Sequence, residues 1–536
     1  MSMAHLRELV ERGPGAHWGQ SQLVKHAIDS SSSRVLPLSL LGPPSRIDDP
    51  IDPGVLVDLA LDRLFGAVTL GLEPFDLSTL FTQPLMDEEA ISFRQAITND
   101  LLKADARAPL LDLIEGLEKV ERLLQLATRA RQPASQQRWL LDAVIVYTET
   151  IQMVASQLEP KPWYSEGLGS LAESLVELSN TQYIRDLTVT AHSVAEGLAA
   201  IDYLLLVEDN AVTVRRTEAN DSNYRDRLNQ LFTHLCGPEV LEPTSTAPPR
   251  PTTHIDDQIL AIVVRLFPEE FANLATFATD HDRFVAPWLV TTERELVFYL
   301  SWIEELLALQ AQGLPCVVPT VSDAPSTQHV EALYDLALAH DLTSSGTIPV
   351  LNQWHLSEDE IVTIITGPNS SGKTTYARSV GQLYHLAALG LPVGATSAVI
   401  TRAPTIATIF SGQEETNRLV GRLESEILQL QAFFAAAKEH SLLITNEILS
   451  STSVDDAVML GRLLIERCRE RHLSCLIVSF VDELAKPEAG IVSLAAVMDE
   501  LTYQPTLRFE RSAPRTRALA LELALRHGLI EPATDD

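Results

Sequence analysis

The chain has 536 residues, of which 46% are hydrophobic, and a formal net charge of −32 at pH 7. This length is sufficient for several hydrophobic cores, so we expect about three domains. The strong acidity argues against non-specific DNA binding over a large surface, which requires clusters of Lys and Arg to neutralise phosphates.

Apolar runs in the sequence are too short to span a bilayer, and the N-terminal residues lack a basic region followed by an apolar stretch. We therefore expect a cytoplasmic protein without membrane contact. The four cysteines have no C-x-x-C spacing, so neither a disulfide framework nor a zinc site is indicated.

The first 345 residues predict an arm followed by long helices. Residues 1–54 are rich in Ser, Pro and Gly and predict a flexible N-terminal arm. From residue 55 onward, apolar residues recur at i, i+3, i+4 and i+7, which predicts an all-α domain of long helices over 55–345. Residues 237–253 are rich in Pro and Thr and predict an exposed loop or linker within it.

From residue 346 onward, short β-branched runs alternate with helical patterns. Such alternation is typical of βαβ units. We therefore expect an α/β domain with a mainly parallel sheet over residues 346–536.

The most informative motif in this second half begins at Ile361. An apolar run to Thr366 is followed by G-x-x-x-x-G-K-T and then by a helical pattern from Tyr376 to Ala388. Backbone N–H groups of a Gly-rich turn at a helix N-terminus can surround a phosphate chain. The predicted nucleotide-binding residues are Gly367, Pro368, Asn369, Ser370, Ser371, Gly372, Lys373, Thr374 and Thr375.

Within this P-loop, Lys373 is expected to reach the outer phosphates and the Thr374 hydroxyl to hold Mg²⁺. The expected ligands are thus ATP and Mg²⁺.

Two further apolar strands bear on catalysis. The first, from Ser441, ends at Asn446 and Glu447. Glu447 is the candidate catalytic residue that polarises the attacking water, and Asn446 stands where a metal-binding carboxylate is needed. An Asn carbonyl can bond a metal-bound water but brings no charge, so we expect slow hydrolysis. The second strand, Leu473 to Ser479, ends in Phe480, where such ATPases often carry a polar γ-phosphate sensor.

Several polar residues have two open interpretations. Asp455 and Asp456 fit either a helix N-terminal cap or a role at a nucleotide interface. The acidic residues at 414–415 and 424–426 are either solvated helix charges or ligands. His355, His385 and His440 show no metal-ligand spacing, which favours surface or core positions.

The motifs together resemble the ATPase domain of the MutS DNA mismatch-repair family. The resemblance rests on Thr366–Thr375, on Asn446–Asp456 and on Ser479–Leu484, with a weaker match at Pro84–Gln95 and at the closing segment Arg517–Leu529. It implies an ABC-ATPase-like P-loop domain preceded by a helical core and lever domain. It further implies a homodimer through the ATPase domains, with ATP at the interface and DNA as partner.

The sequence departs from the family at informative positions. The signature Ser, the second-strand Asp and the third-strand His of the family correspond to Gly421, Asn446 and Phe480. The clamp region is replaced near 237–253, with a reduced remnant possible at 255–290. The N-terminus leaves no room for a mismatch-recognition domain, so mismatch specificity is not expected.

We therefore expect an ATP-binding MutS-like protein, a slow ATPase that couples nucleotide state to DNA binding in DNA repair or recombination. Two alternatives remain open. Residues 350–536 contain 16 basic and 23 acidic residues, a charge of −7, so residues 1–349 carry −25. That acidity favours the first alternative, an ATP-gated scaffold that binds protein. The second alternative is a pseudo-ATPase that only binds nucleotide.

Overall fold

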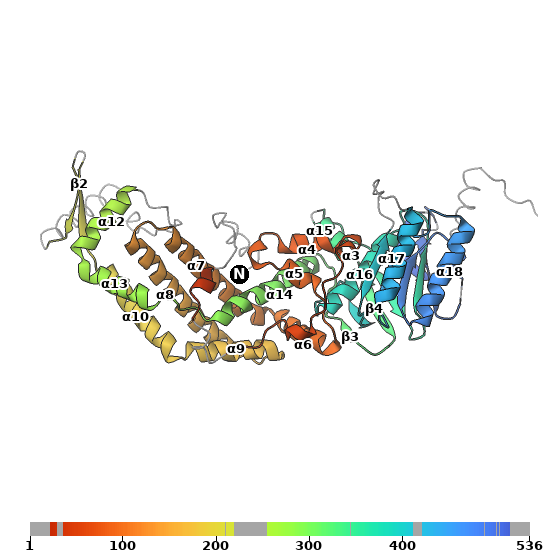
Figure 1. Ribbon diagram of the computed structural model, residues 1–536, viewed down its shortest axis with the longest axis horizontal. Helices are drawn as coiled ribbons and strands as arrows, with labels where there is room; N and C mark the ends of the chain where they lie inside the picture. Colours follow the sequence, from red (N-terminus) through yellow and green to blue (C-terminus); the bar gives the residue numbers. More distant parts are fainter. Residues whose placement is uncertain are drawn as a thin grey trace, which may run out of the picture.

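The structure is a computed structural model that describes residues 22–28, 36–208, 211–218, 254–343, 345–410, 421–486, 488–499, 501–502 and 504–514. These residues form an elongated molecule with a helical part at one end and an α/β part at the other (Figure 1). The predicted loop at 237–253, the acidic pair at 414–415 and the closing segment 517–529 lie outside the described residues.

The helical part is built around an antiparallel pair of long helices, α7 (Ala104–Arg129) and α8 (Pro133–Leu158). Their apolar faces pack on neighbouring helices, as the helical periodicity predicts. The other helices of this part are α2 (Gln22–Lys25), η1 (Pro44–Arg46), α3 (Pro53–Asp58), α4 (Leu61–Thr69), η2 (Glu73–Phe75), α5 (Ser78–Thr82), α6 (Glu88–Leu101), α9 (Glu166–Ser179), α10 (Gln182–Ala199), α12 (His254–Leu266), α13 (Pro268–Asp280) and α14 (Pro287–Ala311).

A β-hairpin lies at the far end of this part, next to α12 and α13 (Figure 1). It pairs β1 (Tyr203–Glu208) with β2 (Ala211–Arg216) in antiparallel register. Residues 55–345 are therefore not all-α, because two six-residue segments of aliphatic and β-branched composition pair as strands.

Part of the predicted N-terminal arm belongs to the core instead. Leu40 is fully buried and Leu41 nearly so. The Leu40 backbone N–H donates to Glu295 Oε2 at 2.7 Å, and its carbonyl accepts from the Tyr299 hydroxyl at 2.6 Å. The segment around Leu40 is thus fixed by α14, a contact that composition alone does not reveal.

The α/β part contains a six-stranded sheet in the order β12-β11-β6-β10-β9-β8. All neighbours pair in parallel except β12, which is antiparallel to β11. The mixed α/β architecture with parallel strands is as expected. The strands are β6 (Val362–Thr366), β8 (Ile406–Phe410), β9 (Leu442–Asn446), β10 (Ser474–Val478), β11 (Ile491–Met498) and β12 (Pro505–Arg511).

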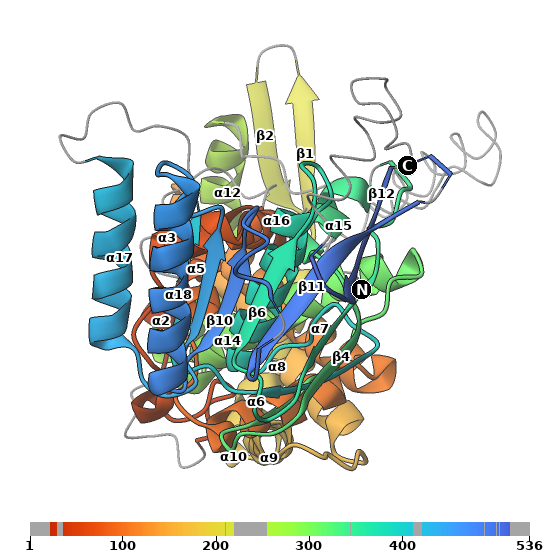
Figure 2. The ribbon, with the colours of Figure 1, turned by 90° about the vertical axis from the view of Figure 1, so that its right-hand side faces the viewer.

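Helices cover both faces of this sheet. α17 (Arg422–Ala436) and α18 (Val454–Glu470) lie on one face (Figure 2), where Phe433 and Leu464 share a core with Ile364. On the other face α16 (Lys373–Ala388) packs in the larger core together with Ile365. A strand covered on both faces is apolar throughout, and every residue of β6 is buried.

A second sheet has the order β3-β7-β4-β5. Two of its strands precede the boundary that we expected at residue 346, so the α/β part begins at about Thr320. Its elements are β3 (Thr320–Ser322), β4 (Gln328–Leu333), β5 (Asn352–Leu356) and β7 (Ser397–Thr401), with α15 (Leu336–Thr343) between β4 and β5.

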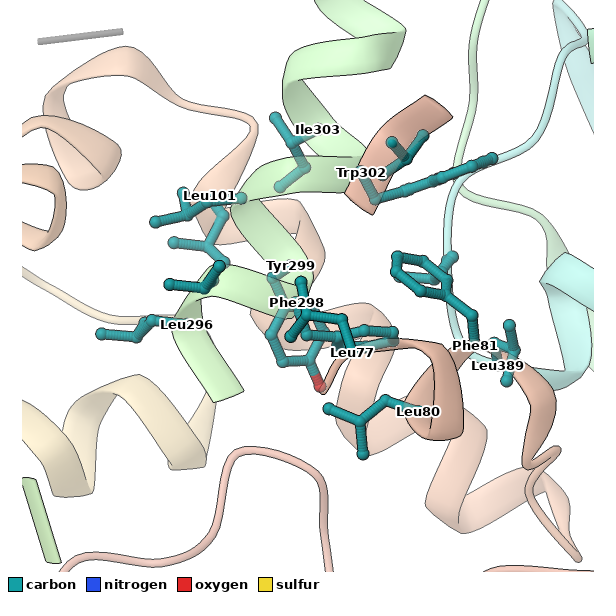
Figure 3. Close-up of a cluster of buried hydrophobic side chains, with 14 of the residues drawn as sticks. Leu77, Leu80, Phe81, Leu101, Leu296, Phe298, Tyr299, Trp302, Ile303 and Leu389 are labelled. Atoms are coloured by element: carbon teal, nitrogen blue, oxygen red, sulfur yellow. The ribbon is translucent and has the colours of Figure 1, made fainter. Parts of the chain in front are cut away.

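One continuous core joins the helical part to α16. Side chains from α5, α6 and α14 pack there beside Leu389, which caps α16 (Figure 3). Two buried hydrogen bonds cross the same boundary: His385 Nε2 to the Phe81 carbonyl at 2.8 Å, and Trp302 Nε1 to the Pro392 carbonyl at 3.1 Å. The helix that follows the P-loop is therefore anchored in the helical part.

In the part of the chain that the structure describes, every helix is too short or too polar to cross a membrane.

Candidate functional site

The P-loop connects the centre of the six-stranded sheet to the N-terminus of α16. It leaves β6 at Gly367, whose φ is 153°, and a Cβ there would lie 2.6 Å from the Ala496 Cβ. It enters α16 through Gly372, whose φ of 88° lies in the left-handed region. Any residue other than glycine would be strained at either position. The first backbone N–H groups of α16 have no partner within the helix and are available to a phosphate at the loop.

Lys373 lies folded into its own loop. Its Nζ donates to the carbonyls of Gly367 at 3.0 Å and Pro368 at 2.9 Å. Burial lowers the pKa of this ammonium, and the nearby Glu447 carboxylate opposes that shift. Next to it, the buried Ser371 hydroxyl has no hydrogen-bond partner in the described structure. The loop therefore holds a cation and a free hydroxyl where a phosphate chain would lie.

Thr374 and Asn446 are brought together by the sheet order. β10 lies between β6 and β9, and the parallel register aligns Ile365, Val478 and Asn446 at the same edge. The Thr374 hydroxyl contacts Asn446 Oδ1 at 3.3 Å. Two neutral oxygens beside a phosphate loop suit Mg²⁺, which completes its shell with phosphate and water oxygens. The residues present thus fit the ion that we expected, although the carboxylate is absent.

Glu447 follows directly and has an unusual backbone. Its φ is 58° and that of Leu449 is 62°, a left-handed conformation that non-glycine residues adopt at a cost of about 1 kcal/mol each. The Glu447 N–H donates to the Val478 carbonyl at 2.9 Å, which extends the ladder by one bond and turns the chain away from the sheet. Such strain persists where the surroundings fix it, and it often accompanies functional sites.

Glu426 on α17 is one of the surroundings that fix this turn. It is buried, its Oε2 accepts from the Leu449 N–H at 2.8 Å, and its Oε1 pairs with Arg422 at 3.2 Å. From the sequence, Glu426 was interpreted as either a solvated helix charge or a ligand. The structure gives it a third role, as the support of the loop after Glu447, whereas Glu424 is exposed.

The acidic pair at the start of α18 belongs to a helix cap. The Ser453 hydroxyl accepts from the Asp456 N–H at 3.2 Å and donates to Asp456 Oδ2 at 2.7 Å. This geometry is the capping alternative of the two that we considered, with Ser453 as the cap residue. It brings Asp456 no contact with the P-loop among the described residues.

A pocket lies beside the loop and was not predicted. It is lined by Gly372, Thr375 and Tyr376 of the loop and α16, and by residues of the β4–α15 connection, β5 and β12. Asn352 closes it by donating to the Leu507 carbonyl at 3.1 Å and accepting from the Phe509 N–H at 3.0 Å. The sequence did not predict this pocket because a third of the lining residues precede residue 346 and were assigned to the helical domain.

Comparison with known proteins agrees with this geometry. Residues 363–509 match the family model of MutS domain V. This match supports a divergent member of the MutS family. The matched segment covers β6, the P-loop, Asn446 and Glu447, and Phe480.

Curated relatives match over a larger segment. Endonuclease MutS2 of Streptococcus pneumoniae strain G54 is 28% identical over 231 residues, which are 42% of this chain and 28% of the relative. Endonuclease MutS2 of Streptococcus equi subsp. equi is 26% identical over 229 residues, with the same coverage. The chain thus spans 28% of the length of these relatives.

Proposed function

We propose that this chain binds ATP with Mg²⁺ and hydrolyses it slowly. The observation that carries the proposal is the assembly of one site at the sheet edge from two segments that are far apart in the sequence. Lys373 reaches into the phosphate loop, the Thr374 hydroxyl contacts Asn446 at 3.3 Å, and Glu447 directly follows Asn446 at the end of β9.

In this proposal the backbone N–H groups of Gly367–Thr375 hold the phosphates and Lys373 neutralises the outer ones. Mg²⁺ supplies charge neutralisation to the phosphate oxygens when bound, with Thr374 and Asn446 as its protein contacts. The pocket closed by Asn352 lies on the α16 side of the loop and is the place for the nucleoside. Apolar walls with a few polar groups suit a nucleobase.

Glu447 is the residue that would orient the attacking water. Slow turnover follows from its neighbours, since Asn446 brings no charge to the metal and Phe480 has no hydrogen-bonding group for the γ-phosphate.

The nucleotide state would reach the helical part through α16. Gln382 of α16 donates to the Leu59 carbonyl at 2.9 Å and to Asp335 at 2.8 Å, and His385 contacts Phe81. A shift of the P-loop on binding ATP therefore moves a helix that is hydrogen-bonded to the helical part. In a homodimer paired through the ATPase domains, this would change the angle between two helical parts, between which DNA would bind in repair or recombination.

The alternative is a scaffold that binds protein instead of DNA. The charge of −25 over residues 1–349 favours it, because an acidic surface repels phosphates unless the basic residues gather in one groove.

Three variants test the nucleotide part. Lys373→Ala should abolish binding of a fluorescent ATP analogue, whereas Glu447→Ala should retain binding and lose steady-state phosphate release. Lys438→Ala, an exposed lysine after α17, is the matched control and should behave as wild type. If Glu447→Ala leaves turnover unchanged, the catalytic assignment is wrong.

Gel shifts with duplex, junction and single-stranded DNA test the partner. Binding at about 50 mM salt that weakens as salt rises supports the DNA reading. If no DNA is shifted at that salt, with or without ATP, the DNA-binding proposal is wrong and the protein-binding scaffold remains.

A further inference from the structure

Two histidines face each other across a ladder outside the nucleotide site. β4 and β5 are antiparallel, and their register sets His329 directly opposite His355. Both side chains lie on the exposed face, whereas their neighbours Val330 and Trp354 point into the core. The two Nδ1 atoms are 3.4 Å apart, and the ring planes are inclined by 79°.

This separation suits a shared metal ion better than a direct hydrogen bond. Nitrogen–oxygen and similar hydrogen bonds in proteins have heavy-atom distances of about 2.7 to 3.2 Å, so 3.4 Å is long for one. Two imidazole nitrogens bound to one tetrahedral zinc, each at about 2.0 to 2.1 Å, lie about 3.3 Å apart. The rings are thus already at the spacing of two ligands on one ion.

The neighbouring side chains fix the tautomer that metal binding needs. His329 Nε2 lies 2.9 Å from Glu331 Oε1, so Nε2 carries the proton that it donates to this carboxylate. The lone pair of His329 then lies on Nδ1, the atom that faces His355. The other oxygen of Glu331 accepts from Gln353 Nε2 at 2.6 Å, which holds the carboxylate in place. A histidine ligand whose second nitrogen donates to a carboxylate is the usual arrangement around protein-bound zinc.

We propose that His329 and His355 bind a divalent transition-metal ion of the zinc and copper class through their Nδ1 atoms. Imidazole nitrogens favour these ions over Mg²⁺ and Ca²⁺. No group of three His, Cys, Asp or Glu side chains in the described residues is arranged to hold a metal, so water completes the coordination shell. The His329 side chain is 49% exposed and His355 is also exposed, which leaves room for that water.

The bound ion clips β4 to β5. The ladder between these strands is interrupted after Val330, and Ala332 has a left-handed φ of 58°. A link at the His329–His355 pair therefore reinforces the ladder where backbone pairing stops. β5 also carries Asn352, which closes the pocket beside the P-loop, so the clip would hold that strand in place.

Titration of the untagged full-length protein with Zn²⁺, in competition with a chromophoric chelator, tests the site. We expect one ion per chain in this site. His329→Gln and His355→Gln should each weaken it at least tenfold, and Glu331→Gln by about tenfold, the usual effect of removing a carboxylate behind a ligand. His192→Gln is the matched control, an exposed histidine 3.9 Å from Glu149 without a second histidine opposite, and should bind as wild type.

Thermal unfolding gives a second measurement that does not depend on stoichiometry. Because the ion binds only the folded ladder, Zn²⁺ should raise the melting temperature of the wild type and not that of either histidine variant. The proposal is overturned if either histidine variant binds Zn²⁺ with wild-type affinity, or if the Zn²⁺-dependent rise persists in both.

Discussion

The ammonium group of Lys373 lies 4.3 Å from the centroid of the Phe480 ring. Two of its N–H groups are taken by the carbonyls of Gly367 and Pro368, so the aromatic face provides the third partner. A cation over an aromatic ring is stabilised by about 0.5 to 2 kcal/mol, more where water is excluded. Phe480 therefore holds the lysine in the nucleotide-free loop, at the strand end where a γ-phosphate sensor was expected.

Replacing this ring should strengthen nucleotide binding. In Phe480→Leu the lysine loses about 1 kcal/mol of stabilisation in the free state, so ATP affinity should rise about three- to tenfold. Titration with a fluorescent ATP analogue measures it. Phe434→Leu is the control, since that ring lies under Arg467 at 5.5 Å and away from the loop. Unchanged or weaker binding in Phe480→Leu would refute a restraining role.

A second prediction concerns the uncharged residue at the metal edge. Asn446→Asp should lower the Mg²⁺ concentration needed for half-maximal phosphate release and raise turnover, because a carboxylate attracts the ion where the amide cannot. A Mg²⁺ titration at saturating ATP provides the measurement. The same change at an exposed site of α13, Asn273→Asp, should have no effect. An Mg²⁺ dependence identical to wild type would show that Asn446 does not contact the ion.

The buried histidine of α16 makes stability depend on pH. His385 Nε2 donates to the Phe81 carbonyl, and Nδ1 is buried without a partner. Burial lowers the pKa of His385 to about 4, from 6.5 in the unfolded chain. The unfolded state thus binds the proton first, so stability is complete above pH 6.5 and is lost as pH falls from 6.5 towards 4.

Between pH 7.5 and 5.5 this loss should be about 1 kcal/mol. His385→Gln keeps a donor for Phe81 and does not titrate. Its stability relative to wild type should therefore improve by that amount over the same pH interval. Urea unfolding at the two pH values gives the comparison, and a difference between the proteins that does not vary with pH would contradict the assignment.

Local sequence patterns predict those parts of the molecule whose partners are adjacent in the chain. The apolar run before Gly367 predicts a strand, and the glycines of the P-loop predict the turn and the start of the helix that follow it. All three elements are confirmed. The strand ending at Asn446 is found for the same reason. Periodicity likewise predicts the long helices α7, α8 and α14.

Contacts between distant segments were not predictable. The buried Leu40 backbone is hydrogen-bonded to the Glu295 carboxylate and the Tyr299 hydroxyl, which are 255 and 259 residues away. The Ser- and Pro-rich composition around Leu40 predicts a loose arm instead. His355 shows no metal spacing because its partner His329 is 26 residues away on another strand, with a helix between them. Asn352 was not predicted because the pocket that it closes depends on contacts between β5 of one sheet and β12 of the other.

The helical part contains a cluster of buried carboxylates that should make it less stable at high pH. Glu118 and Glu121 on α7 and Glu293 on α14 are each only 4% exposed. Burial, reinforced by the neighbouring carboxylates, raises the pKa of Glu118 and Glu293 above the ordinary value. Because the folded pKa is the higher one, the stability that the neutral forms contribute is complete below about pH 4.5 and is lost as pH rises.

Glu293→Gln should therefore raise the melting temperature at pH 8 by about 2 to 4 °C, the shift that about 1 kcal/mol causes in a large domain. At pH 5 the gain should be smaller. Glu177→Gln, an exposed glutamate of α9, is the control and should change little at either pH. A larger gain at pH 5 than at pH 8 would reverse the sign that we assign.

The contact between α16 and the helical part is tested at Gly381. A Cβ at this position would lie 2.3 Å from Leu59 Cδ2, and Leu59 is fully buried. Gly381→Ala should therefore destabilise the protein by about 1 to 3 kcal/mol through overpacking. Gly66→Ala in α4, where nothing lies within 4 Å of the new Cβ, should be neutral or stabilise by about 0.5 to 1 kcal/mol, the helix preference of alanine over glycine.

A double-mutant cycle of Gly381→Ala with Leu59→Ala measures the coupling between these two positions. Leu59→Ala alone should cost about 2 to 5 kcal/mol because it leaves a cavity. Adding the Gly381 methyl group then fills part of that cavity, so the double variant should be more stable than the sum of the two single losses by at least about 0.5 kcal/mol. Strict additivity in urea unfolding would mean that the two side chains do not meet.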